Sequence, residues 1–208
     1  MFMENKTIIT ISRQFGSGGR EIGKKIAEQL NIPFYDKELI EIAAKESGMD
    51  EELFVEDDER TSRGFHLLGA IGYSLGGPLS AMTELTLNDR LFIIQSEVIK
   101  NLAEEGSCVI VGRCADYILQ DRKDVLNVYI HANMKDRMER AVHSYEVDER
   151  DIERSVKKID KRRANYYEYY TDRKWGRAEN YDISINSSTF GIDGSVEIIK
   201  TLAKKKIL

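Results

Sequence analysis

The chain has 208 residues and carries 31 basic and 36 acidic side chains, which gives a formal net charge of −5 at neutral pH. That length suits one domain, or one domain with a modest insertion. With 41% hydrophobic and 32% charged residues, the composition excludes both a disordered chain and a membrane protein. The acidic balance argues against non-specific binding to nucleic acid or to an anionic membrane. Any phosphate-binding surface must therefore be local.

The first part of the chain has the pattern of strand, glycine-rich turn, helix and second strand. A β-branched run at 7–11 predicts a strand, and residues 13–19 contain three glycines. Apolar side chains recur every four residues through 20–30, which predicts an amphipathic helix. A short apolar run at 32–36 predicts the second strand, and the spacing through 37–47 predicts the second helix.

The stretch 46–87 carries the weakest signals for regular structure. Residues 46–60 hold eight acidic side chains and one basic side chain, and the residues after them are rich in glycine. A segment of this length without regular structure is usually functional or mobile in a compact domain. We therefore interpret 46–87 as a flexible insertion or lid within a single domain at 1–208.

The rest of the chain returns to alternating helices and strands. Apolar spacing predicts helices at 88–105, 133–145, 148–170 and 194–206. Apolar runs of the buried type predict strands at 108–111, 125–131 and 181–185. Strands that are continuous apolar runs are typical of a parallel sheet covered on both faces, so the pattern predicts an α/β fold. In such sheets ligands bind beyond the carboxyl ends of the strands.

Neither the first residues nor the cysteines indicate secretion or a membrane anchor. Glu4, Asn5 and Lys6 interrupt the start, and no apolar stretch approaches the roughly 20 residues that span a bilayer. Cys108 and Cys114 are too few for a disulfide scaffold and lack the spacing of a zinc site. We therefore expect a cytoplasmic protein with two free thiols and no metal-ligand cluster.

The turn between the first strand and the first helix has the composition of a phosphate-binding loop. It contains Gly16, Gly18 and Gly19, and glycine lets backbone N–H groups turn inward and approach a ligand closely. The positive end of the helix dipole lies directly behind the turn. The alternatives are a glycine-rich turn without a ligand, and a dinucleotide-binding motif whose spacing these glycines satisfy only in part.

This loop departs from the standard pattern G-x-x-x-x-G-K-[ST]. With Gly18 as the second glycine, Arg13 stands at the first glycine position and Gly19 at the lysine position. Arg20 is the nearest cation that can replace the lysine. The Ser/Thr that would help to hold Mg²⁺ has only weak substitutes nearby, so the sequence leaves open how magnesium is held.

The second half of the chain concentrates arginine in an otherwise acidic protein. Arg113 ends a predicted strand, and Arg137 and Arg140 share one face of a predicted helix. Residues 150–163 hold seven basic and three acidic side chains. Several arginine forks converging on one point would neutralise a transferring phosphoryl group. The alternatives are a solvated helix face with ion pairs and, given the tyrosines at 166–170, a nucleic-acid surface.

Taken in order, five segments resemble the cytidylate kinase-like family, a branch of the P-loop nucleoside monophosphate kinases. They are ITISRQFGSGGREIG, IPFYDKELI, VIVGRCADYIL, KDRMERA and NYDISINSS, and they extend over nearly the whole chain. The resemblance implies a three-layer fold, in which a parallel sheet of about five strands lies between helices and mobile segments form the acceptor site and the lid. It also implies phosphoryl transfer from ATP, with Mg²⁺, to a nucleoside monophosphate such as CMP or dCMP.

Residue roles follow from the positions that match this family. The donor phosphates would be held by Gly16, Ser17, Gly18, Gly19 and Arg20. The acceptor would be bound by Asp36, Arg113, Arg137 and Asp160. The lid at about 145–175 would close over both phosphates with Arg162 and Arg163. Charge neutralisation in catalysis would then come from Arg20, Arg113, Arg137, Arg162 and Arg163.

The leading hypothesis is an ATP-dependent kinase that converts CMP or dCMP to the diphosphate. Because the loop lysine is missing, a non-catalytic nucleotide sensor on the same fold is a first alternative. Because the acceptor segment carries the weakest signals, a kinase for a different small acceptor is a second. The expected partners are small nucleotides, not nucleic acid or a membrane, and the sequence does not indicate an oligomeric state.

Overall fold

The computed structural model describes residues 6–36, 38–48, 86–145 and 151–206. The chain divides into two compact units, one formed by 1–36 with 99–208 and the other by 37–98. In the second unit the described elements are α2 (Glu38–Ser47) and the first part of α4 (Leu87–Glu105). Most of the predicted insertion at 46–87 lies outside the described residues.

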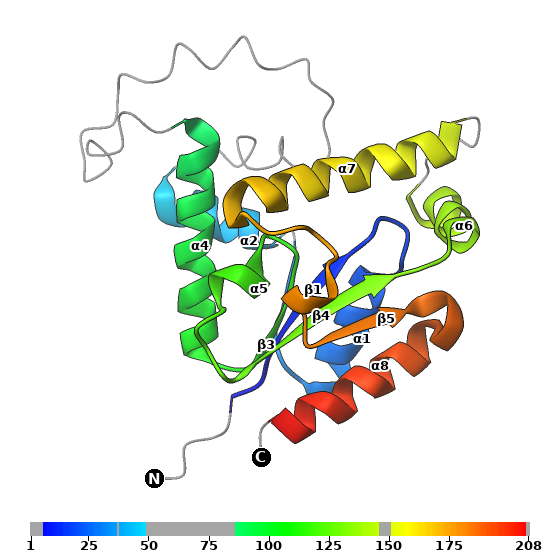
Figure 1. Ribbon diagram of the computed structural model, residues 1–208. Coiled ribbons are helices and arrows are strands. Elements are labelled where there is room, and N and C mark those ends of the chain that lie inside the picture. Colours follow the sequence, from blue (N-terminus) through cyan, green and yellow to red (C-terminus); the bar gives the residue numbers. More distant parts are fainter. Residues whose placement is uncertain (1–5, 37, 49–85, 146–150, 207–208) are drawn as a thin grey trace. The chain divides into compact units, whose positions relative to one another are not determined.

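Five parallel strands form one sheet in the first unit, in the order β2-β3-β1-β4-β5 (Figure 1). They are β1 (Ile8–Arg13), β2 (Phe34–Tyr35), β3 (Cys108–Val111), β4 (Val125–His131) and β5 (Ile183–Asn186). In this register Ile11 of β1 lies between Val111 of β3 and Val128 of β4. The predicted α/β fold with about five parallel strands is confirmed, although β2 is only two residues long and β5 begins two residues later than expected.

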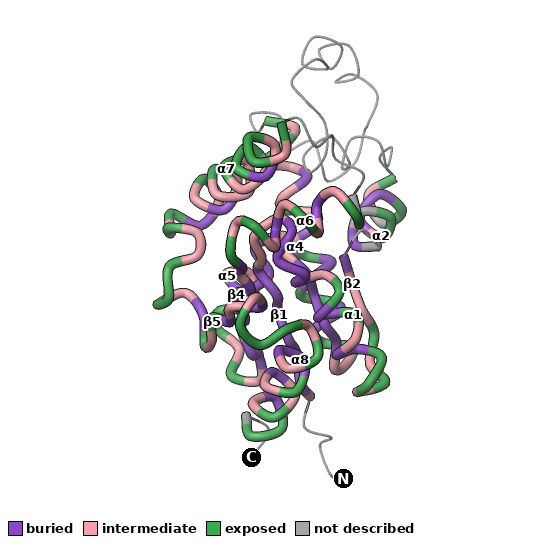
Figure 2. Tube along the Cα trace, turned by 90° about the vertical axis from the view of Figure 1, so that its right-hand side faces the viewer, coloured by how far each residue is buried: buried purple, intermediate pink, exposed green. Residues whose placement is uncertain are grey.

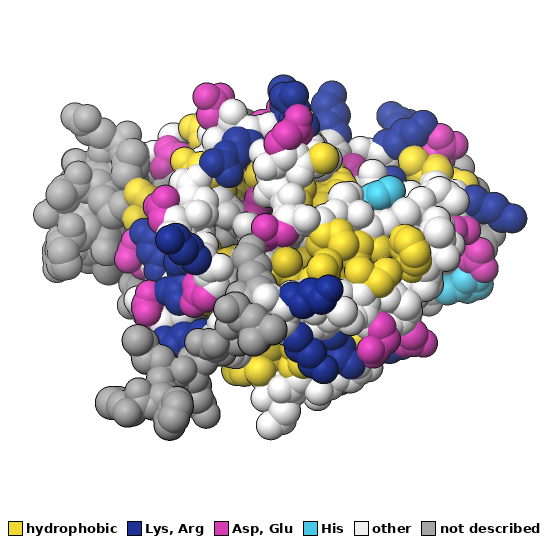
Figure 3. Space-filling model, turned by 60° about the horizontal axis from the view of Figure 1, so that its bottom comes forward, with side chains coloured by type: hydrophobic (Ala, Val, Ile, Leu, Met, Phe, Trp, Pro, Cys, Tyr) yellow, Lys and Arg dark blue, Asp and Glu magenta, His cyan; other side chains and the backbone are white. Residues whose placement is uncertain are grey.

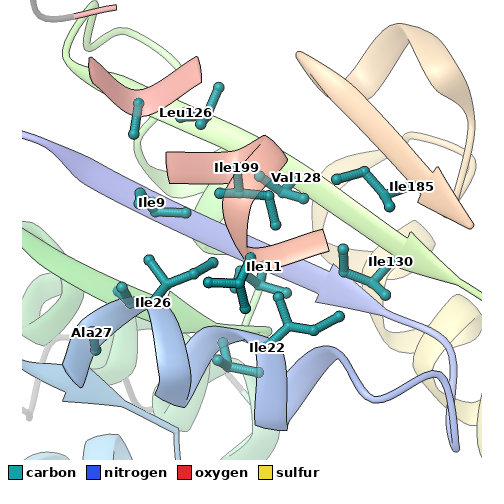
Figure 4. Close-up of a cluster of buried hydrophobic side chains, with 14 residues drawn as sticks. Ile9, Ile11, Ile22, Ile26, Ala27, Leu126, Val128, Ile130, Ile185 and Ile199 are labelled. Atoms are coloured by element: carbon teal, nitrogen blue, oxygen red, sulfur yellow. The ribbon is translucent and has the colours of Figure 1, made fainter. Parts of the chain in front are cut away.

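Two helices, α1 (Gly19–Leu30) and α8 (Ser187–Lys206), pack against the same face of this sheet. Side chains alternate between the two faces of a strand, so Ile9 and Ile11 point to one side together. There they meet Ile22 and Ile26 of α1, and all four are fully buried (Figure 4). Burial of one such side chain stabilises the fold by about 1.5–3 kcal/mol, which makes this face a firm support for the loop before α1.

The remaining elements of the first unit are α5 (Ala115–Ile118), α6 (Met134–Tyr145), α7 (Ile152–Thr171) and the 3-10 turn η4 (Ala178–Asn180). The sequence did not predict α5 and η4, because one turn holds too few residues to show a period. Residues 146–150, which belong to the predicted lid, lie outside the described residues.

The buried residues of the first unit lie mainly between the sheet and the helices that cover it. Figure 2 shows buried residues concentrated in the strands and along one side of α1 and α8, while α7 is mostly exposed or half-buried. Cys108, the first residue of the predicted buried strand at 108–111, is 1% exposed. In the described residues, no helix has the length and apolarity that crossing a bilayer requires.

Candidate active site

The glycine loop connects β1 to α1 at the carboxyl edge of the sheet. Gly16 and Gly18 have φ angles of 73° and 78°, which fall in the left-handed region that favours glycine. A Cβ atom at Gly16 would collide with the carbonyl oxygen of Arg137, and one at Gly18 would lie 2.5 Å from Cδ1 of Ile192. The backbone conformation therefore favours glycine at both positions, and at Gly16 the backbone of Arg137 also leaves no space for a side chain.

The loop leaves polar groups available at the start of α1. The cap residue Gly18 makes no side-chain bond to the first turn, whose N–H groups have no intrahelical partner. The hydroxyl of Ser17 is fully buried and has no hydrogen-bond partner among the described residues. Backbone N–H groups and the helix dipole at such a terminus suit an anion, so the geometry fits a nucleotide phosphate.

Two side chains from α6 and α7 hold the main chain of the loop at Phe15. The Phe15 N–H donates a 2.8 Å hydrogen bond to Oδ1 of Asp160, and Nε of Arg137 donates a 2.8 Å bond to the Phe15 carbonyl. Arg137 and Asp160 also form an ion pair with each other through Nη2 and Oδ2. Because Arg137 is only 4% exposed, these charge-assisted bonds are well shielded from water.

Two further arginines from the same helices contact the loop. Nη1 of Arg140 donates a 2.5 Å bond to the carbonyl of Gly16. Nη1 of Arg163 donates a 3.3 Å bond to the carbonyl of Arg13, and its guanidinium lies 5.7 Å from the ring centre of Phe15. The arginine-rich segments thus fix the shape of the glycine loop in this structure.

At the end of β2, the buried carboxylate of Asp36 pairs with two arginines. It accepts a 2.5 Å bond from Nε of Arg20, and Nη2 of Arg13 lies 3.7 Å from its other oxygen. The Arg20 guanidinium also lies 5.9 Å from the ring centre of Phe34. Arg20 and Asp36, which the sequence assigned to donor and acceptor, are therefore direct partners here.

The chain after β3 turns in a rarely used conformation. Gly112, Arg113 and Cys114 have φ angles of 75°, 56° and 55° in succession. The left-handed region costs a residue other than glycine roughly 1–2 kcal/mol, so Arg113 and Cys114 hold this turn against local strain. Strain of this kind concentrates at functional sites, and the turn lies at the same edge of the sheet as Asp36.

Buried hydroxyl and carboxyl groups tie the end of α7 and the segment after it to the sheet. The Tyr167 hydroxyl donates a 2.7 Å bond to Asp116, and burial raises the pKa of both groups above their ordinary values. The hydroxyl of Ser12 accepts bonds from Nε1 of Trp175 at 2.9 Å and from the Tyr181 hydroxyl at 3.3 Å. Burial raises the pKa of Tyr181 to about 12, so this hydroxyl stays protonated.

A cavity of about 550 Å³ opens beside the glycine loop. Its walls come from the loop, β4, α7 and the segment after α7, and they include Gln14, Tyr129, His131, Asp160, Lys161 and Trp175. That volume lies within the range of small-molecule sites. The cavity shares Asp160 with the contacts that hold the loop, so it borders the candidate site.

The structure therefore brings the predicted donor-site residues 16–20 together in one junction. Of the predicted acceptor and lid residues, Arg137, Asp160 and Arg163 contact the loop main chain, and Arg113 and Arg162 are half-buried. Sequence reasoning did not assign Arg140 or Arg13 to the site. The three-residue spacing of Arg140 from Arg137 and the unusual position of Arg13 in the loop pattern were the available signals.

Mg²⁺ is the metal that the fold implies. No group of three or more metal-ligating side chains occurs in the described residues, and the Ser12 hydroxyl is already engaged. Magnesium in kinases takes one or two protein carboxylates and completes its shell with water and substrate phosphates. The Ser17 hydroxyl, which has no partner among the described residues, fits that limited demand, and the Asp36 carboxylate would join it only in exchange for its bond to Arg20.

The glycine loop lies within a segment that matches a known protein family. The model of the cytidylate kinase-like family matches residues 8–189, from the first residue of β1 to the start of α8. No curated protein matches the chain significantly. An uncharacterised protein from Eubacterium ventriosum is similar at 29% identity with a TM-score of 0.71, over 96% of this chain and 99% of that one.

Two kinases of known structure have a similar fold. Shikimate kinase from Bacteroides thetaiotaomicron is 15% identical with a TM-score of 0.54, over 95% of this chain and 98% of its own. A gluconokinase from Sinorhizobium meliloti is 13% identical with a TM-score of 0.52, over 98% and 97%. At these identities the likeness concerns the fold alone, and it is the fold of P-loop kinases.

Proposed function

The chain belongs to the cytidylate kinase-like family, and on this basis we propose that it transfers a phosphoryl group from ATP to CMP or dCMP. The observation that carries the proposal is the glycine loop, with its left-handed Gly16 and Gly18 at the start of α1. The N–H groups in the first turn of a helix, where this loop ends, suit the oxygens of a polyphosphate. Phosphoryl transfer needs positioning and charge neutralisation more than a covalent group, and this loop with its arginines offers both.

In this proposal each group has a defined task. The loop at 16–20 holds the donor phosphates, and Arg20 and Arg113 neutralise charge as the phosphoryl group moves. Asp36, beside the acceptor, and Ser17 would hold Mg²⁺, which when bound screens the phosphate charges. Arg162 and Arg163 would close α7 over the phosphates and exclude water, which limits hydrolysis of ATP.

The partners we propose are small nucleotides, and the cytoplasm is the proposed location. Among the described residues on the face in Figure 3, basic and acidic side chains are interspersed. Exposed pairs such as Lys24 with Glu28 and Lys200 with Glu197 show the same mixture. A polyanion such as nucleic acid binds a continuous basic surface, so this mixture supports a small phosphorylated ligand instead.

A rate assay over several acceptors tests the proposal. ADP release would be measured with CMP, dCMP, UMP, AMP, shikimate and gluconate, beside calorimetry of ATP binding. We expect the highest kcat/KM with CMP or dCMP. The Gly18→Ala variant, strained at φ 78° and crowded by Ile192, should lose ATP affinity, whereas Gly106→Ala, with open space around its Cβ, should not.

The other outcomes separate the alternatives. A small alcohol as the best acceptor would favour a kinase for a different small acceptor. The likeness in fold to shikimate kinase and gluconokinase supports that alternative. ATP binding without turnover on any acceptor would favour the nucleotide sensor. If the protein does not bind ATP at all, the proposed function is wrong.

A further inference from the structure

The glycine loop departs from the standard pattern at Arg13 and at Gly19, and these two residues are in contact with each other. The pattern places glycine where this chain has Arg13 and lysine where it has Gly19. A Cβ atom at Gly19 would lie 2.6 Å from Cβ and 3.1 Å from Cγ of Arg13. The stem of Arg13 therefore fills the space in which a side chain at position 19 would begin.

The head of Arg13 reaches the carboxyl ends of the neighbouring strands. Its Nη1 lies so close to Gly112 that a Cβ there would collide with it, and Nη2 lies 3.7 Å from Oδ1 of Asp36. Gly112 follows β3 and Asp36 follows β2. The guanidinium thus lies at the edge of the sheet where P-loop folds carry out their chemistry, beside the first turn of α1.

The N–H donors of the Arg13 guanidinium make no hydrogen bond to a described residue. A guanidinium carries five N–H donors, and the 3.7 Å approach to Asp36 is too long to be a hydrogen bond. No hydrogen bond from the Arg13 guanidinium to another described residue is present, although its side chain is only 14% exposed. A largely buried guanidinium without hydrogen bonds favours an anion as its partner.

The other arginines near the loop are engaged differently. Arg20 bonds to Asp36 at 2.5 Å and its side chain is 43% exposed. Arg137 and Arg140 donate to loop carbonyls at 2.8 and 2.5 Å. Among these four arginines, only Arg13 donates no side-chain hydrogen bond to a described residue.

We propose that Arg13 is the phosphate-binding cation that replaces the loop lysine, and that residue 19 is glycine because the Arg13 side chain occupies its space. The inference rests on the proposed function and names the catalytic group within it. The planar fork of Arg13 binds two phosphate oxygens at once and cannot lose its proton, unlike a lysine. It would stabilise the charge on the transferring phosphoryl group, with Asp36 as the positioning residue.

The steric half of the proposal is tested by thermal unfolding, without activity. Alanine normally stabilises a helix relative to glycine, and Gly19 lies in the first turn of α1. In the wild-type background we expect Gly19→Ala to lower Tm, because the added Cβ would clash with the Arg13 side chain. In the Arg13→Gly background the same change should leave Tm unchanged or raise it. A Gly19→Ala effect of the same sign and size in both backgrounds would overturn this half.

The catalytic half is tested by kinetics of Arg13→Gly, Gly19→Lys and the double variant, which restores G-x-x-x-x-G-K. We expect Arg13→Gly to lower kcat at least 100-fold with less than a tenfold change in the Kd for ATP. The double variant should regain at least tenfold over Arg13→Gly, while Gly19→Lys alone should be impaired. Arg154→Ala, an exposed arginine on α7, is the matched control and should keep wild-type rates.

The readouts distinguish failure of this inference from failure of the proposed function. If the wild type binds ATP and turns over but Arg13→Gly keeps kcat within threefold, Arg13 is not the cation and the kinase proposal stands. If the wild type binds ATP without turnover, the same variants are compared by calorimetry. Arg13→Gly must then remove the preference for ATP over ADP, and an unchanged preference overturns the inference. A wild type without ATP affinity overturns both.

Discussion

The carboxylate of Asp160 on α7 accepts a 2.8 Å hydrogen bond from the backbone N–H of Phe15, 145 residues earlier in the chain. Its other oxygen pairs with Arg137, which in turn donates to the Phe15 carbonyl. The N–H and the carbonyl of Phe15 are thus hydrogen-bonded to an acidic and a basic side chain that are themselves paired. The helix that the sequence assigned to the lid is bonded directly to the loop that would bind the donor phosphates.

Asp160→Asn should destabilise the protein and loosen the loop. The change removes the ion pair with Arg137 and weakens the bond to Phe15. Hydrogen bonds to charged groups contribute about 1.5–3 kcal/mol, so we expect a loss of that order in urea unfolding. Hydrogen exchange at the Phe15 amide should accelerate. Glu153→Gln on the same helix breaks only an exposed pair with Lys157 and should cost well under about 1 kcal/mol, and an equal loss in both variants would contradict the prediction.

The buried pair of Asp116 and Tyr167 should give stability an unusual pH dependence. Burial raises the pKa of Asp116, so the folded protein takes up its proton at a higher pH than the unfolded chain does. The cost of its buried charge is therefore present at neutral pH and is relieved as pH falls through the raised pKa. Relative to Asp116→Asn, the wild type should gain stability between pH 7 and 4, by at most about 1.4 kcal/mol per pH unit.

Urea unfolding of both proteins at several pH values measures this difference. Asp121→Asn serves as the control for the loss of an exposed carboxylate. A wild type that loses stability relative to Asp116→Asn on acidification would contradict the assignment of burial as the dominant cause.

Arg20→Ala should reduce turnover more than it reduces acceptor affinity. The side chain is partly exposed and bound to Asp36, so it reaches phosphates only by giving up or sharing that partner. We expect kcat to fall about 10- to 100-fold, less than for Arg13→Gly, with less than a threefold change in the Kd for CMP. Lys24→Ala, one turn further along α1 and more exposed, should be neutral. Loss of CMP affinity without loss of kcat would place Arg20 in acceptor binding instead.

Gly112→Ala should affect both stability and catalysis. The residue has a φ of 75°, and an added Cβ would collide with Nη1 of Arg13. The backbone strain alone costs about 1–2 kcal/mol, and displacement of Arg13 should lower kcat further. Gly106→Ala, where an added Cβ meets no atom within 4 Å, is the matched control. Unfolding curves and initial rates check the two effects separately, and wild-type kcat in Gly112→Ala would count against the role of Arg13.

Much of the fold could be predicted from periodicity. The strands at Cys108–Val111 and Val125–His131 were predicted to the residue, because each is a continuous apolar run between clear breaks. The last helix was predicted to begin at 194, but helical residues start at Ser187 and the chain bends at Gly191, where φ is 66°. A four-residue segment before a bend shows no period, so sequence patterns could not place it.

The sequence by itself determined what depends on neighbours along the chain. The glycine loop, the helix behind it and the order of strands follow from local spacing, and so did the observation that Arg13 and Gly19 break the standard pattern. Only the tertiary structure decided which groups each arginine contacts. Asp160 reaches Phe15, and Arg13 passes over Gly19 to Gly112, because parallel strands bring their carboxyl ends to one edge. The physical reason is that the partners of these charged side chains lie far away in the sequence and become neighbours only when the chain folds. Contacts of this kind leave no periodic pattern in the sequence.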